Sequence, residues 1–203
     1  MNELTGRVVL ITGAGKGAGR LLAQAFAERG AFVAANDISP VNVEQVVDEI
    51  HARGGQARAY IEDVAKKLGA QYLINQVEED FGRIDILINH ASVEPHIPLL
   101  EIDEWDWHRV LDVNLTGAFL MTQSAGRLMR AQGGGTIINL IAAGKSESKT
   151  GTAFAATMSG LEGFSRQAAF ELSTYGIAVH AMVSDGMIVD RILALLAEGK
   201  DRP

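Results

Sequence analysis

Cysteine is absent from this sequence of 203 residues. Its absence excludes disulfide bonds, thiolate metal sites and a cysteine nucleophile. The five histidines lack the spacing typical of metal ligands, so we expect no metal site. Apolar runs of transmembrane length are lacking too, because Asn, Gly or charged residues interrupt the longest ones. No membrane is therefore expected as a partner.

Basic residues are in the minority, with 18 Lys and Arg against 25 Asp and Glu and a formal net charge of −7. This balance gives no electrostatic reason to expect nucleic acid or an anionic membrane as a partner. The first apolar run begins within a few residues of Met1, which leaves no room for a secretory signal peptide. We therefore expect a cytoplasmic protein.

Short apolar runs alternate with longer helical stretches along the chain. Strands rich in Val, Ile and Leu that alternate with helices predict a parallel sheet covered on both faces. We predict an α/β fold with a Rossmann-type, doubly wound parallel sheet, three layers deep, in a single domain of residues 1–203. The expected strands are 7–11, 31–36, 57–61, 84–89, 136–141 and 177–183, and the expected helices are 21–27, 41–53, 66–81, 103–132 and 153–175.

A glycine-rich turn, Thr12-Gly13-Ala14-Gly15-Lys16-Gly17-Ala18-Gly19, follows the first predicted strand. Glycine allows backbone angles closed to other residues and lets a phosphate approach the main chain. The N-terminus of the next helix offers N–H groups and a partial positive charge to a pyrophosphate. Asp37 follows the second strand, eighteen residues after Gly19, about where dinucleotide-binding folds place an acid for the adenosine ribose. The alternative role of Asp37 is to cap the following helix.

Asp37 also bears on the choice between the two nicotinamide dinucleotides. Lys16 could favour the additional phosphate of NADP, whereas the carboxylate of Asp37 would repel it. Because Asp37 is expected at the ribose itself and a lysine side chain can swing into solvent, the sequence favours NAD over NADP.

Several independent motifs make the chain resemble the short-chain dehydrogenase/reductase family over nearly its whole length. The glycine-rich turn matches the family's TGxxxGxG pattern, and Asp63-Val64 matches its adenine-contacting pair. Asn89-His90-Ala91-Ser92 resembles the NNAG motif, with His90 and Ser92 as departures. Asp112–Gly117 resembles the segment that carries the family's catalytic asparagine, here Asn114.

The resemblance implies a Rossmann-type sheet and a nicotinamide cofactor. It also implies a small carbonyl or alcohol substrate and a homodimer or homotetramer built on the 103–132 helix and the one after it. The candidate cofactor-binding residues are Gly13, Gly15, Lys16, Gly17, Ala18, Gly19, Asp37, Ile38, Asp63, Val64, Asn89, His90 and Ala91. Asn114 is the candidate catalytic residue, and its alternative role is a structural one, bonded to backbone within its helix.

The catalytic groups of the family are missing at the positions where the resemblance expects them. In the family a serine orients the carbonyl, a tyrosine passes the proton, and a lysine four residues later lowers the tyrosine pKa from its ordinary value of ~10. The sequence predicts Ala142 at the serine position, Ala155 at the tyrosine position and Ser159 at the lysine position.

Two functions are compatible with this pattern. The first is a nucleotide-binding family member with no turnover, or very slow turnover. The second is an NAD-dependent oxidoreductase that uses a non-standard proton donor. The donors considered are Glu94 and His96 and, in the loop after Ala142, the polar residues 145–149.

The remaining expectations concern the long helix and the end of the chain. Trp105 and Trp107 fall near the start of the 103–132 helix, where helical spacing turns one of them inward. Core or subunit packing is the default role for these tryptophans, and stacking on a ligand is the alternative. By the same resemblance, the substrate-covering segment and the last strand of the family are expected to be shortened after the apolar stretch 188–196.

Overall fold

Six strands form one parallel sheet in the computed structural model, which describes residues 4–142 and 150–198. The strand order is β3-β2-β1-β4-β5-β6, and every neighbouring pair is parallel. The order reverses between β1 and β4, which defines the doubly wound topology that the strand–helix alternation predicts. The strands are β1 Val8–Thr12, β2 Phe32–Asn36, β3 Gln56–Tyr60, β4 Ile86–Asn89, β5 Gly135–Ala142 and β6 Ile177–Ser184.

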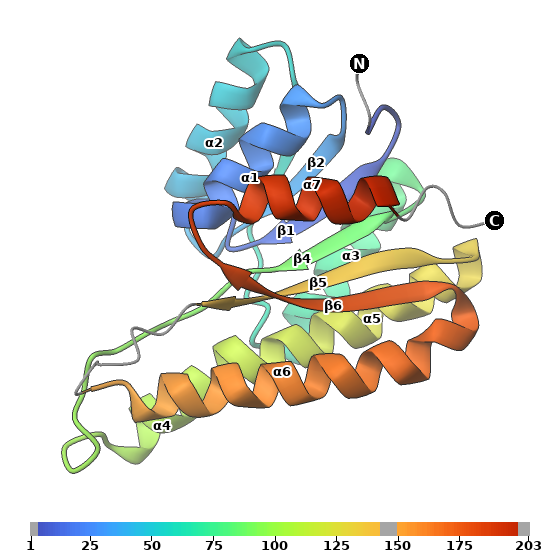
Figure 1. The fold of residues 1–203 in the computed structure, drawn as a ribbon. Coiled ribbons are helices and arrows are strands. Elements are labelled where there is room, and N and C mark those ends of the chain that lie inside the picture. The colour runs from blue at the N-terminus through green and yellow to red at the C-terminus, as the bar shows by residue number, and fades with distance from the viewer. Residues whose placement is uncertain (1–3, 143–149, 199–203) are drawn as a thin grey trace.

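Helices cover both faces of the sheet, so the predicted three layers are confirmed (Figure 1). On one face lie α1 (Gly17–Glu28), α2 (Pro40–Ala52) and α7 (Ile188–Glu198). On the other lie α3 (Lys67–Phe81), α5 (Gly117–Gln132) and α6 (Thr152–Leu172). None of the helices in the described ranges is both long and apolar enough to cross a membrane.

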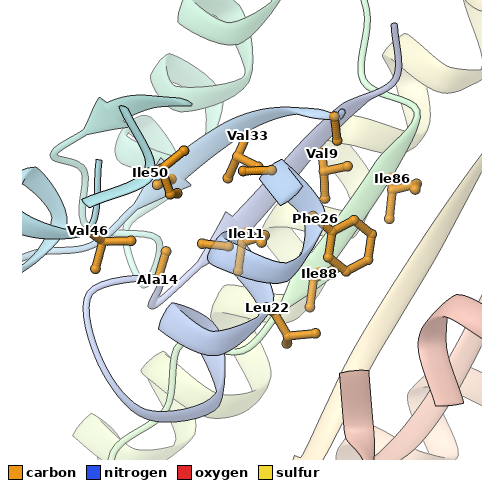
Figure 2. Close-up of a cluster of buried hydrophobic side chains, with 14 of the residues drawn as sticks. Val9, Ile11, Ala14, Leu22, Phe26, Val33, Val46, Ile50, Ile86 and Ile88 are labelled. Carbon is orange, nitrogen blue, oxygen red and sulfur yellow. The ribbon is translucent and has the colours of Figure 1, made fainter. Parts of the chain in front are cut away.

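Two apolar clusters, one on each side of the sheet, hold the layers together. In the first cluster Phe26 of α1 lies over Val9, Ile86 and Ile88, which come from β1 and β4 (Figure 2). Ile192 of α7 is fully buried in the same cluster. Since burial of apolar area is the main favourable term in folding, these contacts explain why both central strands are nearly continuous in Val, Leu and Ile.

The stretch expected as one helix over 103–132 is interrupted. It consists of α4 (Glu104–Leu111), a π-helical turn η1 (Asp112–Thr116) and α5. The side chain of Asp103 caps α4 by accepting a hydrogen bond from the amide of Asp106 at 2.8 Å. A π turn is rare and often marks a functional site, and this one contains the buried Asn114.

The other helix boundaries agree with the expected ranges to within a few residues. The 153–175 helix is α6 followed by a short 3₁₀ turn, η2 (Ser173–Tyr175). The apolar stretch 188–196 forms most of α7 and packs against α1. Because all six strands are parallel, their carboxyl ends face the same edge of the molecule, on the side of α4 in Figure 1. In this topology ligands bind at that edge, next to the point where the strand order reverses.

Candidate functional site

The glycine-rich turn joins β1 to α1 at the carboxyl edge of the sheet. Gly13 and Gly17 have φ angles of 66° and 53°, in the left-handed region that favours glycine. A Cβ on Gly19 would meet the Gly13 carbonyl group and the His90 ring. The turn therefore requires glycine at these positions, as the sequence predicted, and Lys16 stands at the N-cap of α1 with an exposed side chain.

Asp37 is held directly against this turn. One oxygen of its carboxylate accepts a hydrogen bond from the Gly15 amide at 3.0 Å, and the other accepts from the Ser39 amide at 3.0 Å. A Cβ on Gly15 would lie 2.8 Å from the Asp37 carboxylate, so glycine is needed for this approach. The alternative role, capping of the next helix, is represented by the bond from the amide of Ser39, the N-cap residue of α2, whose own side chain makes no capping bond. Asp37 also lines a groove beside the turn.

A groove of about 390 Å³ runs from Asp37 across the carboxyl edge of the sheet. It is lined by residues at the ends of β2 and β3 and before α3, and by residues of α4 and η1. Several predicted cofactor-binding residues meet here. The lining residues are Gly13, Asn36, Asp37, Ile38, Glu62, Asp63, Val64, Ala65, Lys66, Ala91, Ser92, Val93, Trp105, His108, Arg109, Asp112 and Val113.

The segment after β4 is tied to β1 through the Thr12 hydroxyl. The amides of His90 and Ala91 donate to the Thr12 Oγ1 at 3.1 and 3.2 Å. Asn89 faces the core instead, where its Nδ2 donates to Asn139 Oδ1 at 2.8 Å. Asn89 therefore holds β4 to β5 and lines a small inner cavity of about 10 Å³, close to the size of one water molecule.

His90 lies next to the glycine-rich turn, and burial lowers its pKa below the ordinary value of 6.5. The nearby charge of Asp37 opposes this shift, but the effect of burial is the larger one. The ring is therefore neutral at pH 7. A neutral imidazole here removes a positive charge that would otherwise offset the Asp37 carboxylate.

The side chain of Asn114 links η1 to the loop after β4 and to α6 by hydrogen bonds. Its Oδ1 accepts from the Val93 amide at 2.8 Å, and its Nδ2 donates to the Val93 carbonyl at 3.0 Å and to the Thr157 hydroxyl at 3.2 Å. The alternative structural role predicted hydrogen bonds from Asn114 to the backbone of its own helix. The partners are instead Val93, in the loop after β4, and Thr157 of α6. Thr157 in turn donates to the Phe154 carbonyl at 2.8 Å.

The structure places the two α6 residues assigned from the sequence on the solvent-exposed side of that helix. Ala155 and Ser159 are exposed and are not among the described residues that line the groove or the inner cavity. The pair with the same four-residue spacing that turns inward is Phe154 and Met158, which are 5% and 7% exposed. Met158 lines the inner cavity together with Asn89, Asn114 and Leu140.

The other residues considered for proton transfer are placed less favourably. Glu94 and His96 have exposed side chains 3.9 Å apart and are not among the described residues that line the groove. Ala142 ends β5 and pairs with Ser184 of β6. Residues 145–149 lie outside the described residues. The described part of the chain also contains no group of three or more His, Asp or Glu side chains that could hold a metal ion.

Three groove residues are not predicted, or only partly predicted, by the sequence pattern. The pattern does not indicate His108 or Arg109, and it gives stacking on a ligand only as the alternative role of Trp105. Their spacing contains the missed signal, because residues 105, 108, 109 and 112 share one face of a helix. That helix begins shortly after the loop that follows β4, so this face meets the carboxyl edge of the sheet.

A parallel sheet with this strand order, a glycine-rich turn and an acid after β2 defines a Rossmann-type dinucleotide-binding protein. The family model of the short chain dehydrogenases matches residues 7–192. The chain therefore belongs to the short-chain dehydrogenase/reductase family, whose members bind NAD or NADP.

Relatives and solved structures agree with this assignment. An uncharacterized oxidoreductase of Thermotoga maritima is 40% identical over 178 residues, which cover 87% of this chain and 70% of the relative. The structure of a NAD⁺-bound xylitol dehydrogenase has a TM-score of 0.85 at 30% identity and covers 97% of this chain and 78% of its own. A metagenomic short-chain oxidoreductase in complex with NADP has a TM-score of 0.87 at 29% identity, with 96% and 91% covered.

Proposed function

We propose that this chain is a dinucleotide-binding member of its family in which apolar side chains replace the proton relay, so that turnover is absent or very slow. The observation that supports this most directly is the inward-facing pair Phe154 and Met158 on α6. Phenylalanine has the shape of tyrosine without the hydroxyl, and methionine is unbranched like lysine without the ammonium group. The pair therefore fills the space of the family's tyrosine and lysine but has no proton to transfer.

The third group of the relay is absent at Ala142, the last residue of β5. A methyl group cannot donate a hydrogen bond to a substrate carbonyl. Loss of a positioned acid typically costs ~10²–10⁴-fold in rate, and loss of the carbonyl-orienting hydroxyl adds to it. Asn114 is retained, yet both polar atoms of its amide are already bonded to Val93 and Thr157. We therefore assign Asn114 a structural role.

We further propose that NAD is bound in preference to NADP. Asp37 is fixed by two backbone amides in the groove, where it can accept hydrogen bonds from ribose hydroxyls and would repel a 2′-phosphate. Glu62 lines the same part of the groove and adds a second negative charge. Lys16 lies on the exposed side of the turn and does not line the groove, within the described residues.

A second candidate function is an NAD-dependent oxidoreductase of carbonyl or alcohol substrates with a non-standard donor. Ser184 favours it, because this residue of β6 pairs with Ala142 of β5. Paired residues of neighbouring strands point to the same face of a sheet, with backbones about 4.8 Å apart. The Ser184 hydroxyl therefore lies one strand away from the missing serine and could orient a carbonyl.

The first experiment compares the natural chain with the triple variant Ala142→Ser, Phe154→Tyr, Met158→Lys over a panel of ketones and secondary alcohols with NAD(H). The matched control is Ala142→Ser, Ala155→Tyr, Ser159→Lys, which places the same side chains on the exposed side of α6. We expect no measurable turnover by the natural chain or the control, and measurable turnover by the first variant.

Turnover by the natural chain at ordinary enzymatic rates would overturn the proposal of a lost relay. In that case the variant Ser184→Ala tests the second candidate function. That function requires the variant to lose activity and to keep NADH binding. Calorimetry with NAD⁺ and NADH on the natural chain tests dinucleotide binding independently of any turnover.

We also propose that the chain forms a homo-oligomer through α5 and α6. Phe119 of α5 remains 41% exposed although its ring lies edge-on to Phe164 of α6, with the ring centres 6.3 Å apart. Exposed aromatic rings gathered where two helices lie side by side are typical of a protein–protein contact.

A further inference from the structure

The part of the groove formed by α4, its outer wall, consists of Trp105, His108 and Arg109, an unusual set for a surface helix. Asp63 and Lys66 also line this groove. Trp105 is 67% exposed, whereas Trp107 on the same helix is half-buried. A large indole that is exposed yet lines a groove has apolar area available for a ligand.

The indole of Trp105 is held in place on one face. The guanidinium carbon of Arg109 lies over its ring, 5.6 Å from the centroid, within the range of a cation–π contact. Arg109 is itself 3.9 Å from the Asp106 carboxylate. With one face occupied by a charged group that its own helix positions, the indole leaves its other face for a planar partner.

The position of this wall determines which part of a bound dinucleotide it would contact. Asp37 lines this groove beside the glycine-rich turn, where the adenosine ribose is expected. A base attached to a ribose at Asp37 would enter the same groove, which Asp63, Lys66 and Trp105 also line. The inner cavity beside Met158, by contrast, holds about 10 Å³ and is too small for a ring.

We propose that Trp105, oriented by Arg109, forms an outer wall that stacks on the adenine of the bound dinucleotide. This proposal rests on the proposed dinucleotide binding and assigns the adenine half as the part that Trp105 recognises. Base–aromatic stacking on an exposed indole is worth an affinity change of about 5- to 100-fold on substitution by alanine. Affinity for ADP-ribose then depends on Trp105 as strongly as affinity for NAD⁺ does.

The experiment measures the affinities of NAD⁺ and ADP-ribose by calorimetry for the natural chain, Trp105→Ala and Trp105→Phe. The matched control is Trp107→Phe, on the same helix but outside the residues that line the groove. We expect Trp105→Ala to weaken both ligands about tenfold and Trp105→Phe to restore most of the loss. Trp107→Phe should bind like the natural chain, and its single remaining indole should change its fluorescence on binding ADP-ribose. Thermal unfolding of each variant checks that this exposed substitution leaves the fold intact.

The outcomes separate this inference from the proposed function. If the natural chain binds NAD⁺ and ADP-ribose and Trp105→Ala binds them equally well, the stacking wall is wrong and the proposed function stands. The stacking wall is also wrong if NAD⁺ binding weakens while ADP-ribose binding does not, since the indole would then contact the nicotinamide half. If the natural chain binds neither ligand, the proposed dinucleotide binding is wrong, and the proposed stacking by Trp105 is wrong as well.

Discussion

At the scale of single residues, the groove depends on side chains whose partners are backbone groups. Asp37 is the clearest case, because both of its oxygens accept hydrogen bonds from amides, one in the glycine-rich turn and one before α2. The carboxylate therefore keeps its position whether or not a ligand is present. Discrimination between the two dinucleotides then depends on its charge.

The substitution Asp37→Asn tests this because it removes the charge with little change of shape, and its one oxygen can still accept from one of the two amides. We expect the preference for NADH over NADPH to fall about tenfold, since a like charge no longer faces the 2′-phosphate. Calorimetry with both dinucleotides measures the ratio, and Asp48→Asn on the exposed face of α2 controls for net charge. An unchanged ratio of NADH to NADPH affinity would mean that a group other than Asp37 discriminates between the two dinucleotides.

His90 makes a prediction about pH because burial lowers its pKa. Above pH 6.5 the ring is neutral in the folded and the unfolded chain, so it makes no pH-dependent contribution. As the pH falls below 6.5, the unfolded chain takes up a proton that the folded chain does not. The free energy of unfolding therefore decreases, by at most about 1.4 kcal/mol per pH unit, until the pH reaches the lower folded pKa.

The substitution His90→Asn should remove this acid-dependent loss. Urea unfolding between pH 7 and pH 5 measures it, with His96→Asn, an exposed position, as the control. The pKa of His180 is also lowered by burial, but this residue is present in every variant, so the difference between variants isolates His90. Equal pH profiles for His90→Asn and the natural chain would contradict the prediction.

At the scale of secondary-structure elements, buried polar chains join the strands to the helices beneath them. Asn139 of β5 donates to the Ser165 hydroxyl of α6 at 2.8 Å and accepts from Asn89 of β4 at 2.8 Å. Ser165 then donates to the Leu161 carbonyl at 2.6 Å. These bonds fix the rotation of α6 over the sheet, and with it the face that presents Met158.

The substitution Asn139→Ala should lower the free energy of unfolding by about 2–4 kcal/mol. It removes the buried acceptor of one Asn89 N–H group and the buried donor to the Ser165 hydroxyl. The remaining bonds of these groups go to Thr122 and Leu161. A buried polar group that loses a partner costs more than the lost bond alone. Urea unfolding measures the change. The control Gln167→Ala removes an exposed bond to Glu171 and should stay within about 0.5 kcal/mol of the natural chain. An equal decrease in the free energy of unfolding in both variants would show that the buried bonds stabilise the fold no more than an exposed one.

The two elements that the sequence described least well were the long helix and α6. Apolar periodicity continues through residues 103–132, so a π turn at Asp112–Thr116 leaves no mark in the pattern. On α6 the family resemblance identifies the helix but does not show which of its residues are buried. The buried positions Ala153, Phe154, Thr157, Met158 and Leu161 follow helical spacing and would have identified the inward face.

At the scale of the whole molecule, local patterns were sufficient for the architecture and for the core of the groove. The parallel sheet follows from continuous apolar strands between helices, and the glycine-rich turn with Asp37 follows from backbone geometry at fixed spacing. The wall formed by Trp105, His108 and Arg109 was harder to predict. It requires knowing how α4 meets the edge of the sheet, which depends on the loop after β4 and not on any local pattern.

The last prediction concerns assembly. Phe119 and Phe164 lie where α5 and α6 run side by side on one face of the molecule (Figure 1). If this face joins two copies, light scattering at micromolar concentration gives about twice the chain mass of 21.7 kDa. The substitution Phe119→Asp should then give a monomer, because a charge placed in a paired apolar face is left without a partner.

The matched control is Leu68→Asp, since Leu68 is 79% exposed on α3, away from the contact between α5 and α6. This variant should keep the mass of the natural chain. Dissociation by Leu68→Asp but not by Phe119→Asp would move the interface to α3, and a monomeric natural chain would reject assembly altogether. Because Trp105 and the groove lie on α4 and the carboxyl edge, a monomeric Phe119→Asp variant should still bind NAD⁺, which separates assembly from recognition of the ligand.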